Sequence, residues 1–182
     1  MDFHEYRGLL LSDFARCKMG GNTFFGSFLS NPGLRHTCLV RTTRFLSEGK
    51  RVFHFPLYVI SKLFLAVHSR IYNINIPFRT AIGPGFYING PEKIVISSKA
   101  RIGNNCSVCR GVAIHYVCKG KYPGAPVIKD NVYIGPNSKI VGGIEVGNNV
   151  CIGPKSVVTE PVHDNFAVMT LPDFLGVQER PG

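Results

Sequence analysis

Six histidines are the candidates for acid–base chemistry in this chain, and His115 is the one whose position suggests a catalytic role. It directly follows an aliphatic residue, Ile114, and stands at the start of a polar stretch over residues 116–126. Histidine is the usual general base in enzymes because its ordinary pKa lies near neutrality. We predict that a strand buries Ile114 and turns His115 outward as a catalytic base; a solvated or interface histidine is the alternative. The others are interpreted as surface or cap residues: His4, His36, His54, His68 and His163.

The six cysteines predict neither a disulfide framework nor a metal site. Cys106 and Cys109 form the sequence C-S-V-C, which could suggest zinc or redox chemistry. A structural zinc site would need a second pair of ligands, and none follows at a suitable distance. A buried thiol behaves as a small apolar residue, so we interpret these cysteines as structural and expect no metal.

The chain is basic, with a formal net charge of +10 over 182 residues. Residues 1–70 hold ten Lys or Arg against four Asp or Glu, a net charge of +6, and residues 71–182 supply the remaining +4. Nucleic acid is not the expected partner, because the sequence has no recognition-helix signature and no aromatic ladder. A phosphate-rich small molecule or an anionic membrane surface accounts for the charge equally well.

The residues between Ile76 and Val162 repeat with a period of six, and this repeat must position the candidate base. Six is not a helical period, and short strands joined by tight Gly-Asn or Pro-Asn corners explain it. Such strands stack as coils about 4.8 Å apart and bury ladders of Ile and Val. Antiparallel hairpins, the alternative, would need a looser register. The repeating aliphatic residues are Ile76, Ile82, Ile88 and Ile94; Ile96, Ile102, Val108 and Ile114; and Ile128, Ile134, Ile140, Val146, Ile152 and Val158.

Two insertions interrupt the repeat, at residues 89–93 and 116–126. Insertions in repeat proteins usually carry the specific function, because the repeats themselves are occupied with stacking. We therefore expect both insertions to form parts of a site. Asn89 and Glu92, in the first of them, are predicted to bind the substrate.

Residues 1–70 are predicted to form a small helical N-terminal cap, ahead of a β-helix over residues 71–162 with a loop at 115–127 and a tail over 163–182. Helices are expected over 2–17, from Asn31-Pro32-Gly33 to Gly49, and over 55–69. The third is apolar almost all round, so it either packs against the end of the β-helix or lies on a membrane through residues 55–70. Residues 178–182 are expected to fray.

No apolar run reaches the length of a membrane span, and the first residues lack the features of a signal peptide. The expected location is the cytoplasm.

Three stretches of the repeat resemble a known family. I-G-N-N-C-S at 102–107 and I-G-P-N-S-K-I-V-G-G-I-E-V-G-N-N-V-C-I-G-P-K-S-V-V at 134–158 resemble the hexapeptide acyltransferases. I-P-F-R-T-A-I-G-P-G-F-Y-I at 76–88 resembles their serine acetyltransferase-like branch. The resemblance implies a mainly β, left-handed parallel β-helix, a homotrimer, and transfer of an acetyl group from acetyl-CoA to a small-molecule hydroxyl acceptor, either serine or, preferably, a sugar of a surface polysaccharide.

The sequence departs from that family where the family carries functional residues. Gly90 stands at the position of one family histidine, and Ala125 lies near the position of the second. The closing motif of the family appears as residues 170–173, T-L-P-D. The competing hypothesis is therefore a trimeric β-helix that has lost catalysis and serves as a binding or scaffolding subunit.

The resemblance also implies a binding surface for acetyl-CoA along the corners of the β-helix. The pantetheine arm could lie along the backbone amides of glycines without side-chain obstruction, and lysines could bind the phosphates. The alternative is that these glycines only turn corners. The predicted donor-binding residues are Gly135, Gly142, Gly143, Gly153 and Lys155.

Overall fold

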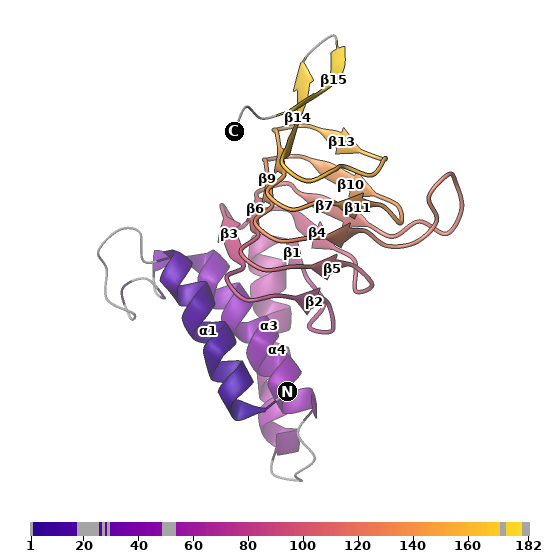
Figure 1. Cartoon of the computed structure of the whole chain (residues 1–182). Coiled ribbons are helices and arrows are strands. Elements are labelled where there is room, and N and C mark those ends of the chain that lie inside the picture. The colour runs from indigo at the N-terminus through magenta and orange to yellow at the C-terminus, as the bar shows by residue number, and fades with distance from the viewer. Residues whose placement is uncertain are drawn as a thin grey trace.

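The protein consists of three helices followed by a stack of short strands (Figure 1). The computed structural model describes residues 2–17, 26, 28, 30–48, 54–171 and 174–179. The helices are α1 (Phe3–Cys17), α3 (Pro32–Glu48) and α4 (His54–Tyr72), close to their predicted bounds. The sequence Gly20-Gly21-Asn22, which favours a helix end, lies outside the described residues.

The strands form three sheets that wrap around one core. Sheet A contains β1 (Ile74–Asn75), β4 (Ile94–Ile96), β7 (Ala113–His115), β10 (Lys139–Val141) and β13 (Val157–Val158). Sheet B contains β2 (Ala81–Ile82), β5 (Arg101–Ile102), β8 (Val127–Ile128) and β11 (Glu145–Val146). Sheet C contains β3 (Tyr87–Asn89), β6 (Ser107–Cys109), β9 (Tyr133–Ile134), β12 (Cys151–Ile152), β14 (Phe166–Leu171) and β15 (Phe174–Glu179). Each of the first four coils contributes one strand to each sheet, and the last coil contributes β13 and β14 and meets sheet B only through the bridge of Val162 to Val146. The predicted β-helix is confirmed as a parallel β-solenoid of about five turns.

The register of the ladders confirms the six-residue repeat and locates the second insertion. Ladder partners in sheet A are 18 residues apart from Val95 to Ala113 and from Lys139 to Val157. Between them, Ala113 and Lys139 are 26 residues apart, so eight extra residues leave the stack in that coil. All of them fall between β7 and β8, at the predicted loop.

The interior of the solenoid consists of stacked aliphatic residues. Ile114, Ile134, Ile140 and Ile152 are each fully buried, as the repeat predicts. Backbone N–H groups of each coil donate to carbonyls of a neighbouring coil, for example Val95 N to Val112 O at 2.9 Å. Each coil therefore depends on its neighbours for both its core and its hydrogen bonds.

A column of asparagines turns the corner between sheets B and C. Asn131, Asn149 and Asn165 have φ values of 59°, 56° and 63°, in the left-handed region that asparagine tolerates better than most residues. Their side chains form a ladder, with Asn131 Nδ2 donating to Asn149 Oδ1 at 3.1 Å and Asn149 Nδ2 to Asn165 Oδ1 at 2.9 Å. The Asn residues of the repeat thus supply both the turn geometry and a contact between coils.

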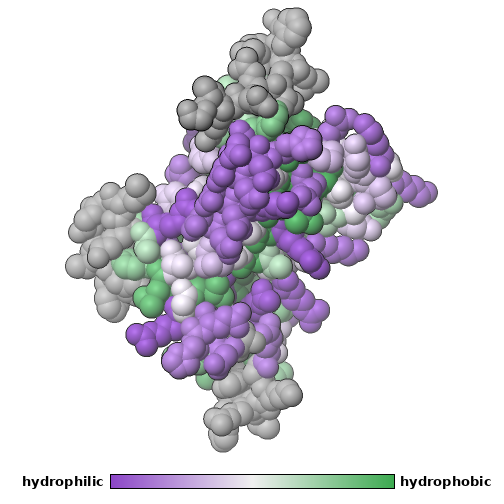
Figure 2. All heavy atoms as spheres, viewed as in Figure 1, coloured by the Kyte–Doolittle hydropathy of each residue, from purple (hydrophilic) through white to green (hydrophobic). Residues whose placement is uncertain are grey.

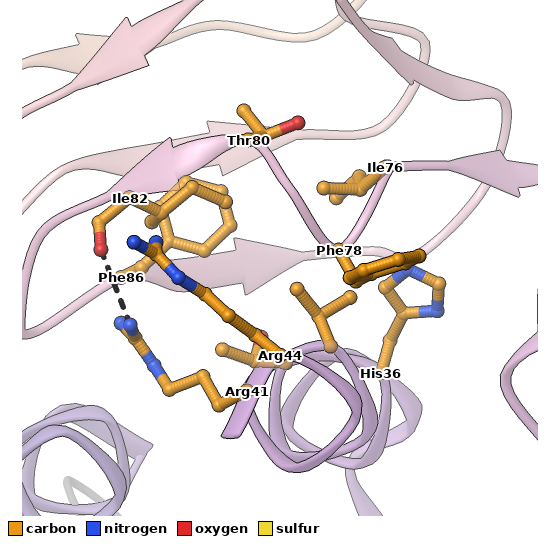
Figure 3. A pocket seen from close by; sticks show the side chains of 10 residues that line it. His36, Arg41, Arg44, Ile76, Phe78, Thr80, Ile82 and Phe86 are labelled. Atoms are coloured by element: carbon orange, nitrogen blue, oxygen red, sulfur yellow. Dashed lines mark hydrogen bonds between the residues drawn. The ribbon is translucent and has the colours of Figure 1, made fainter. Parts of the chain in front are cut away.

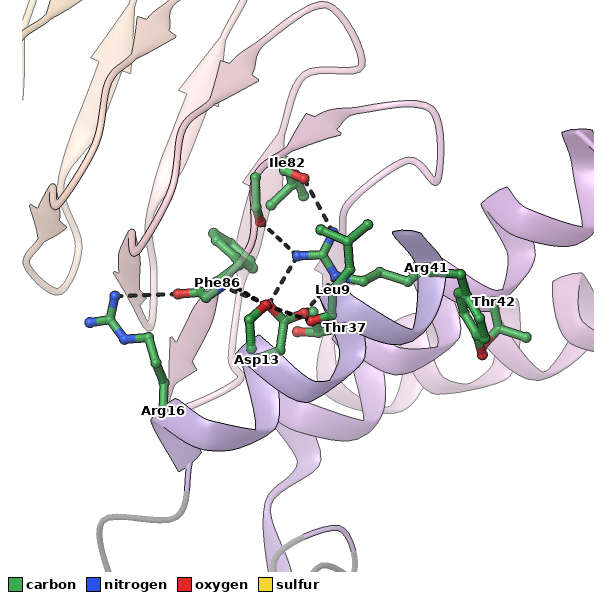
Figure 4. Close-up of polar contacts among 12 residues, drawn as sticks. Leu9, Asp13, Arg16, Thr37, Arg41, Thr42, Ile82 and Phe86 are labelled. Atoms are coloured by element: carbon green, nitrogen blue, oxygen red, sulfur yellow. Dashed lines mark hydrogen bonds and ion pairs between the residues drawn. The ribbon is translucent and has the colours of Figure 1, made fainter. Parts of the chain in front are cut away.

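The first coil has no coil beneath it, and the helices take that place (Figure 4). Arg41 of α3 pairs with Asp13 of α1 at 2.6 Å and donates to the carbonyls of Ile82 and Gly83 at 3.2 and 2.7 Å. Asp13 Oδ1 also accepts from Phe86 N at 2.9 Å. One buried ion pair therefore satisfies backbone groups that a coil would otherwise satisfy.

Helix α4 lies beside α3 and buries only a narrow face. Ser61 and Leu65 are buried, and the ring of Tyr58 meets Phe78 at the base of the solenoid. His68, Ser69 and Tyr72 are half-buried, and most of the remaining surface is exposed although its residues are largely apolar. No helix in the described part of the chain is long and apolar enough to cross a membrane.

The chain ends in an antiparallel hairpin on sheet C. β14 pairs in parallel with β12 and in antiparallel with β15. Gln178 and Glu179 pair with Ala167 and Phe166, so the expectation that the chain frays from residue 178 was wrong for these two. Their backbone pairs with β14, which makes β15 the edge strand of sheet C. Residues 180–182 lie outside the described residues.

Candidate functional site

The predicted site residues fall on two different corners of the solenoid. His115, Gly142 and Gly143 lie where strands of sheet A lead into sheet B, which we call the A–B corner. Strands of sheet C lead into sheet A at the C–A corner, where the other predicted residues lie: Asn89, Glu92, Gly135, Gly153 and Lys155. Sheet A separates the two corners, so a single chain does not bring these groups together.

His115 is the last residue of β7 and is exposed, as predicted. Ile114 before it is fully buried, which turns the imidazole away from the core. The backbone fixes its place: His115 is the ladder partner of Val141, and its carbonyl accepts from Gly142 N at 3.2 Å. The imidazole therefore starts from a rigid strand, at the root of the inserted loop.

The inserted loop over residues 116–126 projects from the side of the solenoid, and hydrophilic residues gather at its outer end (Figures 1 and 2). Val117 and Gly124 exchange two backbone hydrogen bonds, of 2.9 and 2.8 Å, that close the loop into a narrow hairpin. Lys121 Nζ pairs with Glu160 Oε1 at 2.8 Å, which connects the loop to the A–B corner of the last coil. Lys99 Nζ lies 4.0 Å from the ring centroid of Tyr116, at the root of the loop.

A groove of about 210 Å³ opens between the loop and the solenoid. Lys119 and Lys121 lie on its loop side, and Val141 and Gly142 on its solenoid side. It is open to solvent and bears two lysines and one acid, Glu160, which is paired with Lys121. The remaining positive charge suits an elongated ligand that carries phosphates. The remaining lining residues are Val117, Gly120, Tyr122, Thr159 and Glu160.

Gly142 and Gly143 lie against their own loop. A Cβ on Gly142 would come within 2.7 Å of Tyr122 O, and one on Gly143 within 2.4 Å of Pro123 O. Gly142 also has a φ of 99°, which strains any residue with a side chain. These glycines are therefore needed for close packing of the loop, whatever else they bind.

Gly135 and Gly153 are needed for the stacking of coils. A Cβ on Gly135 would lie 2.8 Å from the backbone of Gly153, and one on Gly153 would lie 3.1 Å from Val168 O. Lys155, two residues further on, has a φ of 57° and turns the C–A corner with its side chain exposed. Of this group, Lys155 alone offers a side chain to a ligand.

The C–A corner of the first coil carries the other insertion. Gly90 has a φ of 72°, and a Cβ there would meet only the side chain of Arg110, at 3.6 Å. Asn89 and Glu92 flank it, and both have exposed side chains. The position where the family carries a histidine thus has room for a side chain but a backbone conformation that favours glycine.

A cleft of about 340 Å³ lies between this corner and the helical cap. The cap side is the start of α3, where Asn31 Oδ1 accepts from Gly33 N at 3.0 Å and Leu34 N at 3.2 Å. The described lining consists of neutral residues: Cys17, Ser30, Asn31, Pro32, Tyr87, Ile88, Asn89, Gly90 and Pro91. Glu92 is not among them. Burial raises the pKa of Cys17 to about 11, so this thiol is not poised as a nucleophile.

His36 and His68 lie together inside the cap. Their Nδ1 atoms are 3.2 Å apart, His36 is fully buried, and no partner of either Nε2 is found among the described residues. Burial, followed by the proximity of His68, lowers the pKa of His36 to about 3. His36 also borders a hollow at the base of the solenoid (Figure 3). The hollow has about 20 Å³ of space, enough for a single water and not for a substrate.

Cys106 is buried in the solenoid, as predicted, and burial raises its pKa to about 11. The described residues contain no group of three or more His, Cys, Asp or Glu that could hold a metal ion. Sequence reasoning missed the cleft beside Gly90, because its two walls lie more than fifty residues apart in the chain. The only signal in the sequence is Asn31 before Pro32, which predicts the start of a helix.

The model of the bacterial transferase hexapeptide family (six repeats) matches residues 125–160. The chain is 35% identical over 130 residues to a serine acetyltransferase of Bacillus subtilis, covering 71% of this chain and 58% of that protein. It is 29% identical over 144 residues to a serine acetyltransferase of Synechococcus elongatus, covering 79% of this chain and 57% of that protein. The chain thus spans less than two thirds of the length of these relatives.

Solved structures show the same fold. A serine acetyltransferase of Entamoeba histolytica in complex with cysteine superimposes with a TM-score of 0.75 at 24% identity, covering 96% of this chain and 62% of that one. A serine acetyltransferase of Neisseria gonorrhoeae in complex with serine gives a TM-score of 0.74 at 22% identity, covering 93% and 68%. The chain belongs to the hexapeptide-repeat transferases, in the family of the serine acetyltransferases.

Proposed function

We propose that the protein is an acetyl-CoA-dependent O-acetyltransferase that acts on a small hydroxylated acceptor. The observation that carries this proposal is the inserted loop, which places His115 at its root and a lysine-lined groove beneath it on a transferase scaffold. A subunit that only stacked would not need an eight-residue departure from an otherwise regular coil.

The donor would lie in the groove under the loop. Lys119 offers an exposed cation for its phosphates, whereas Lys121 is already paired with Glu160. Lys155 lies across sheet A from this groove, so it could reach the donor only from another copy of the chain. The donor supplies the acetyl thioester. His115 takes the proton of the acceptor hydroxyl while the hydroxyl oxygen attacks the thioester carbonyl. The C–S bond then breaks, the acetyl ester is formed, and the leaving thiolate takes the proton from His115.

The acceptor favoured by the cleft is a neutral, polyhydroxylated molecule such as a sugar. The described lining offers amide and hydroxyl groups from Asn31, Asn89, Ser30 and Tyr87 and no charged side chain. A zwitterionic acceptor such as serine would leave its carboxylate and ammonium without ionic partners there, which is costly on binding. A sugar finds hydrogen-bond partners of the right kind.

The complete site requires a second copy, and we propose a homotrimer. His115 at the A–B corner and the cleft at the C–A corner lie on opposite sides of sheet A within one chain. Cyclic packing of identical solenoids would place the A–B corner of one copy against the C–A corner of the next. Light scattering at micromolar concentration should give the trimer mass, and a monomer would contradict the proposal.

The central test is acetyl-CoA turnover with a panel of serine and neutral sugars as acceptors. His115→Ala should lower kcat by roughly a hundredfold or more and leave the affinity for acetyl-CoA unchanged, since a general base acts on the transition state. Lys119→Ala is the matched control and should instead raise KM for acetyl-CoA. Normal turnover by His115→Ala would remove His115 from the mechanism.

The competing hypothesis of a scaffolding subunit has its own test. Wild-type protein that binds acetyl-CoA but acetylates no acceptor, while Gly90→His gains activity, would indicate a decayed site. That substitution must accept a φ of 72°, so its folding is checked by circular dichroism before its activity is compared.

A further inference from the structure

Arg110 lies beside the cleft at the C–A corner, against the glycine at its rim. It directly follows β6 and turns this corner one coil further from the cap than Gly90. A Cβ built on Gly90 would lie 3.6, 3.9 and 3.8 Å from Cβ, Cγ and Cδ of Arg110. The aliphatic stem of Arg110 therefore runs alongside Gly90, which itself lines the cleft.

The backbone of Arg110 is fixed by both neighbouring coils. Its N–H donates to Asn89 O at 3.1 Å, and its carbonyl accepts from Asn137 N at 2.9 Å. Both hydrogen bonds belong to the stacking of the solenoid, so the stem starts from a rigid corner. A binding group that is held in this way has less freedom to lose when it meets a ligand.

The side chain of Arg110 is exposed and has no ionic partner among the described residues. None of the ion pairs in this part of the chain includes Arg110 or Glu92, the acid of the neighbouring insertion. Arg16 and Arg41, by contrast, donate to groups of the solenoid. The guanidinium of Arg110 thus keeps its N–H donors available for a ligand.

The cleft and Arg110 offer different chemistry to a ligand. The described lining of the cleft supplies amide and hydroxyl groups but no charge. In the insertion at the same corner, Lys93 offsets the charge of Glu92, and both are exposed. The charge of Arg110 therefore remains as a single net cation next to a neutral cleft.

A guanidinium group is suited to carboxylates and phosphates. Its planar fork donates two parallel N–H bonds to two oxygens of one anion, and these bonds are stronger than those between neutral groups. A sugar hydroxyl cannot accept such a pair of bonds. The class of group that fits Arg110 is therefore an oxyanion.

We propose that the acceptor sugar carries an anionic group, a carboxylate or a phosphate, and that Arg110 binds this group at the rim of the cleft. The inference rests on the proposed function and narrows its class of acceptor. The sugar ring would lie in the neutral cleft, and its anionic group would lie outside the lining, beside Gly90. Such an acceptor would use both the hydrogen-bonding groups of the cleft and the unpaired cation.

A free amino acid fits this arrangement less well. Its carboxylate could meet Arg110, but its ammonium group would find no acid among the described residues that line the cleft. An ammonium group that is taken out of water without an ionic partner is costly. An anionic sugar has no such group.

The test is the affinity of the full chain for matched sugars, measured by ligand-observed NMR titration. Glucose and galactose are the neutral probes, and the uronate and the 6-phosphate of each carry an anion on the same ring. For at least one of the two sugars, wild type should bind an anionic form roughly tenfold more tightly than the neutral form, because charge-assisted hydrogen bonds are added. Serine is titrated alongside them.

Arg110→Gln should remove the preference for the anionic forms and leave the affinity for the neutral sugars unchanged. Arg110→Lys keeps the charge but not the planar fork, so it should bind the anionic forms more weakly than wild type and more tightly than Arg110→Gln. Arg101→Gln is the matched control, because Arg101 is an exposed arginine on sheet B, away from the cleft, and it should leave the preference intact. Circular dichroism checks the fold of each variant, and Arg110→Lys alone decides the test should Arg110→Gln fail to fold.

Equal affinity of wild type for the neutral and anionic forms would overturn the proposal, and so would a preference that survives in Arg110→Gln. Tighter binding of serine than of any anionic sugar, lost in Arg110→Gln, would identify an amino acid as the ligand and would also overturn it. These measurements need no turnover. Acetylation of neutral sugars without any preference would count against this inference alone, whereas the expected preference without acetylation of any acceptor would count against the proposed activity alone.

Discussion

In the solenoid the buried side chains are aliphatic residues in ladders, whereas in the cap helix α3 they include His36, Thr37, Arg41 and Thr43. The exposed residues are reversed as well, since the cap exposes large apolar residues along α4. The solenoid completes its own core, one coil on the next. The cap instead completes the first coil with polar groups and leaves apolar side chains of α4 exposed. Mutations in the two regions should therefore destabilise the protein in different ways.

The largest effect is expected from a charge in the solenoid core. Ile134 is fully buried between Val108 and Ile152 in its ladder. Ile134→Asp would bury a carboxylate without a partner, at a cost of several kcal/mol, and should unfold the protein. Circular dichroism measures this directly. A variant with a native spectrum and native mass would show that the ladder tolerates a buried carboxylate, and the prediction would be wrong.

Arg41→Ala should be the most damaging change in the cap. It leaves Asp13 buried without its cation and removes the donors to Ile82 O and Gly83 O, at a cost of about 3–5 kcal/mol. Urea unfolding followed by hydrogen exchange should show protection lost first in α1, α3 and the first coil. Arg44→Ala is the control, because its pair with Glu48 is about 38% exposed and worth little. Equal stability of the two variants would refute the anchoring role of Arg41.

Acidification should weaken the cap before the solenoid. Burial lowers the pKa of His36 to about 3, while an unfolded histidine titrates near 6.5. Between these values the unfolded state binds more protons than the folded state, so stability falls as pH drops below about 6.5. We expect unfolding free energy to be on the order of 2–3 kcal/mol lower at pH 4.5 than at pH 7.5. Burial also lowers the pKa of His68, in the same direction.

His36→Leu should flatten this pH dependence, whereas His163→Leu, on an exposed solenoid corner, should not. Midpoints of urea unfolding across this pH range provide the measurement. A steep profile that survives in His36→Leu would assign the acid sensitivity to another group.

The smallest effect concerns the asparagine column. Asn149→Ala loses two amide contacts and forces alanine to a φ of 56°, which should cost about 1–2 kcal/mol. Asn149→Gly keeps the turn conformation and loses only the contacts, so it should cost less. Thermal midpoints of the two variants separate backbone strain from the side-chain ladder, and equal midpoints would mean that the strain is negligible.

The difference between the regions also explains which structural features could be predicted from the sequence. A six-residue spacing specifies locally which residue of each strand faces inward, so Ile114, Ile134 and the outward His115 were placed correctly. The cap offers no such local rule. Asp13 and Arg41 are 28 residues apart, and nothing in the pattern of either helix pairs them. Because it is apolar almost all round, helix α4 was expected either to pack against the end of the β-helix or to lie on a membrane. Its packing inside the chain covers only one side.

The site was predicted in its parts rather than in its arrangement. The spacing correctly put His115 at the root of the loop, but it could not show that Asn89 lies across sheet A from it. Counting in steps of six residues assigns each position to a corner of the solenoid, and each insertion shifts this count for the residues that follow it. The close approach of Tyr122 and Pro123 to Gly142 and Gly143 was also beyond prediction, because it depends on how the loop folds back.

The eight-residue insertion leaves the ladder on both sides of it in register, and this makes the A–B corner a natural point for exchanging loops. Loop-closure entropy grows only slowly with length, so a longer or shorter segment between His115 and Val127 should alter the ligand that the corner accepts far more than it alters stability. Chimeras that carry the corresponding loop of a relative could therefore transfer donor or acceptor preference onto an unchanged scaffold. New specificities could arise at this corner without any residue of the core having to change.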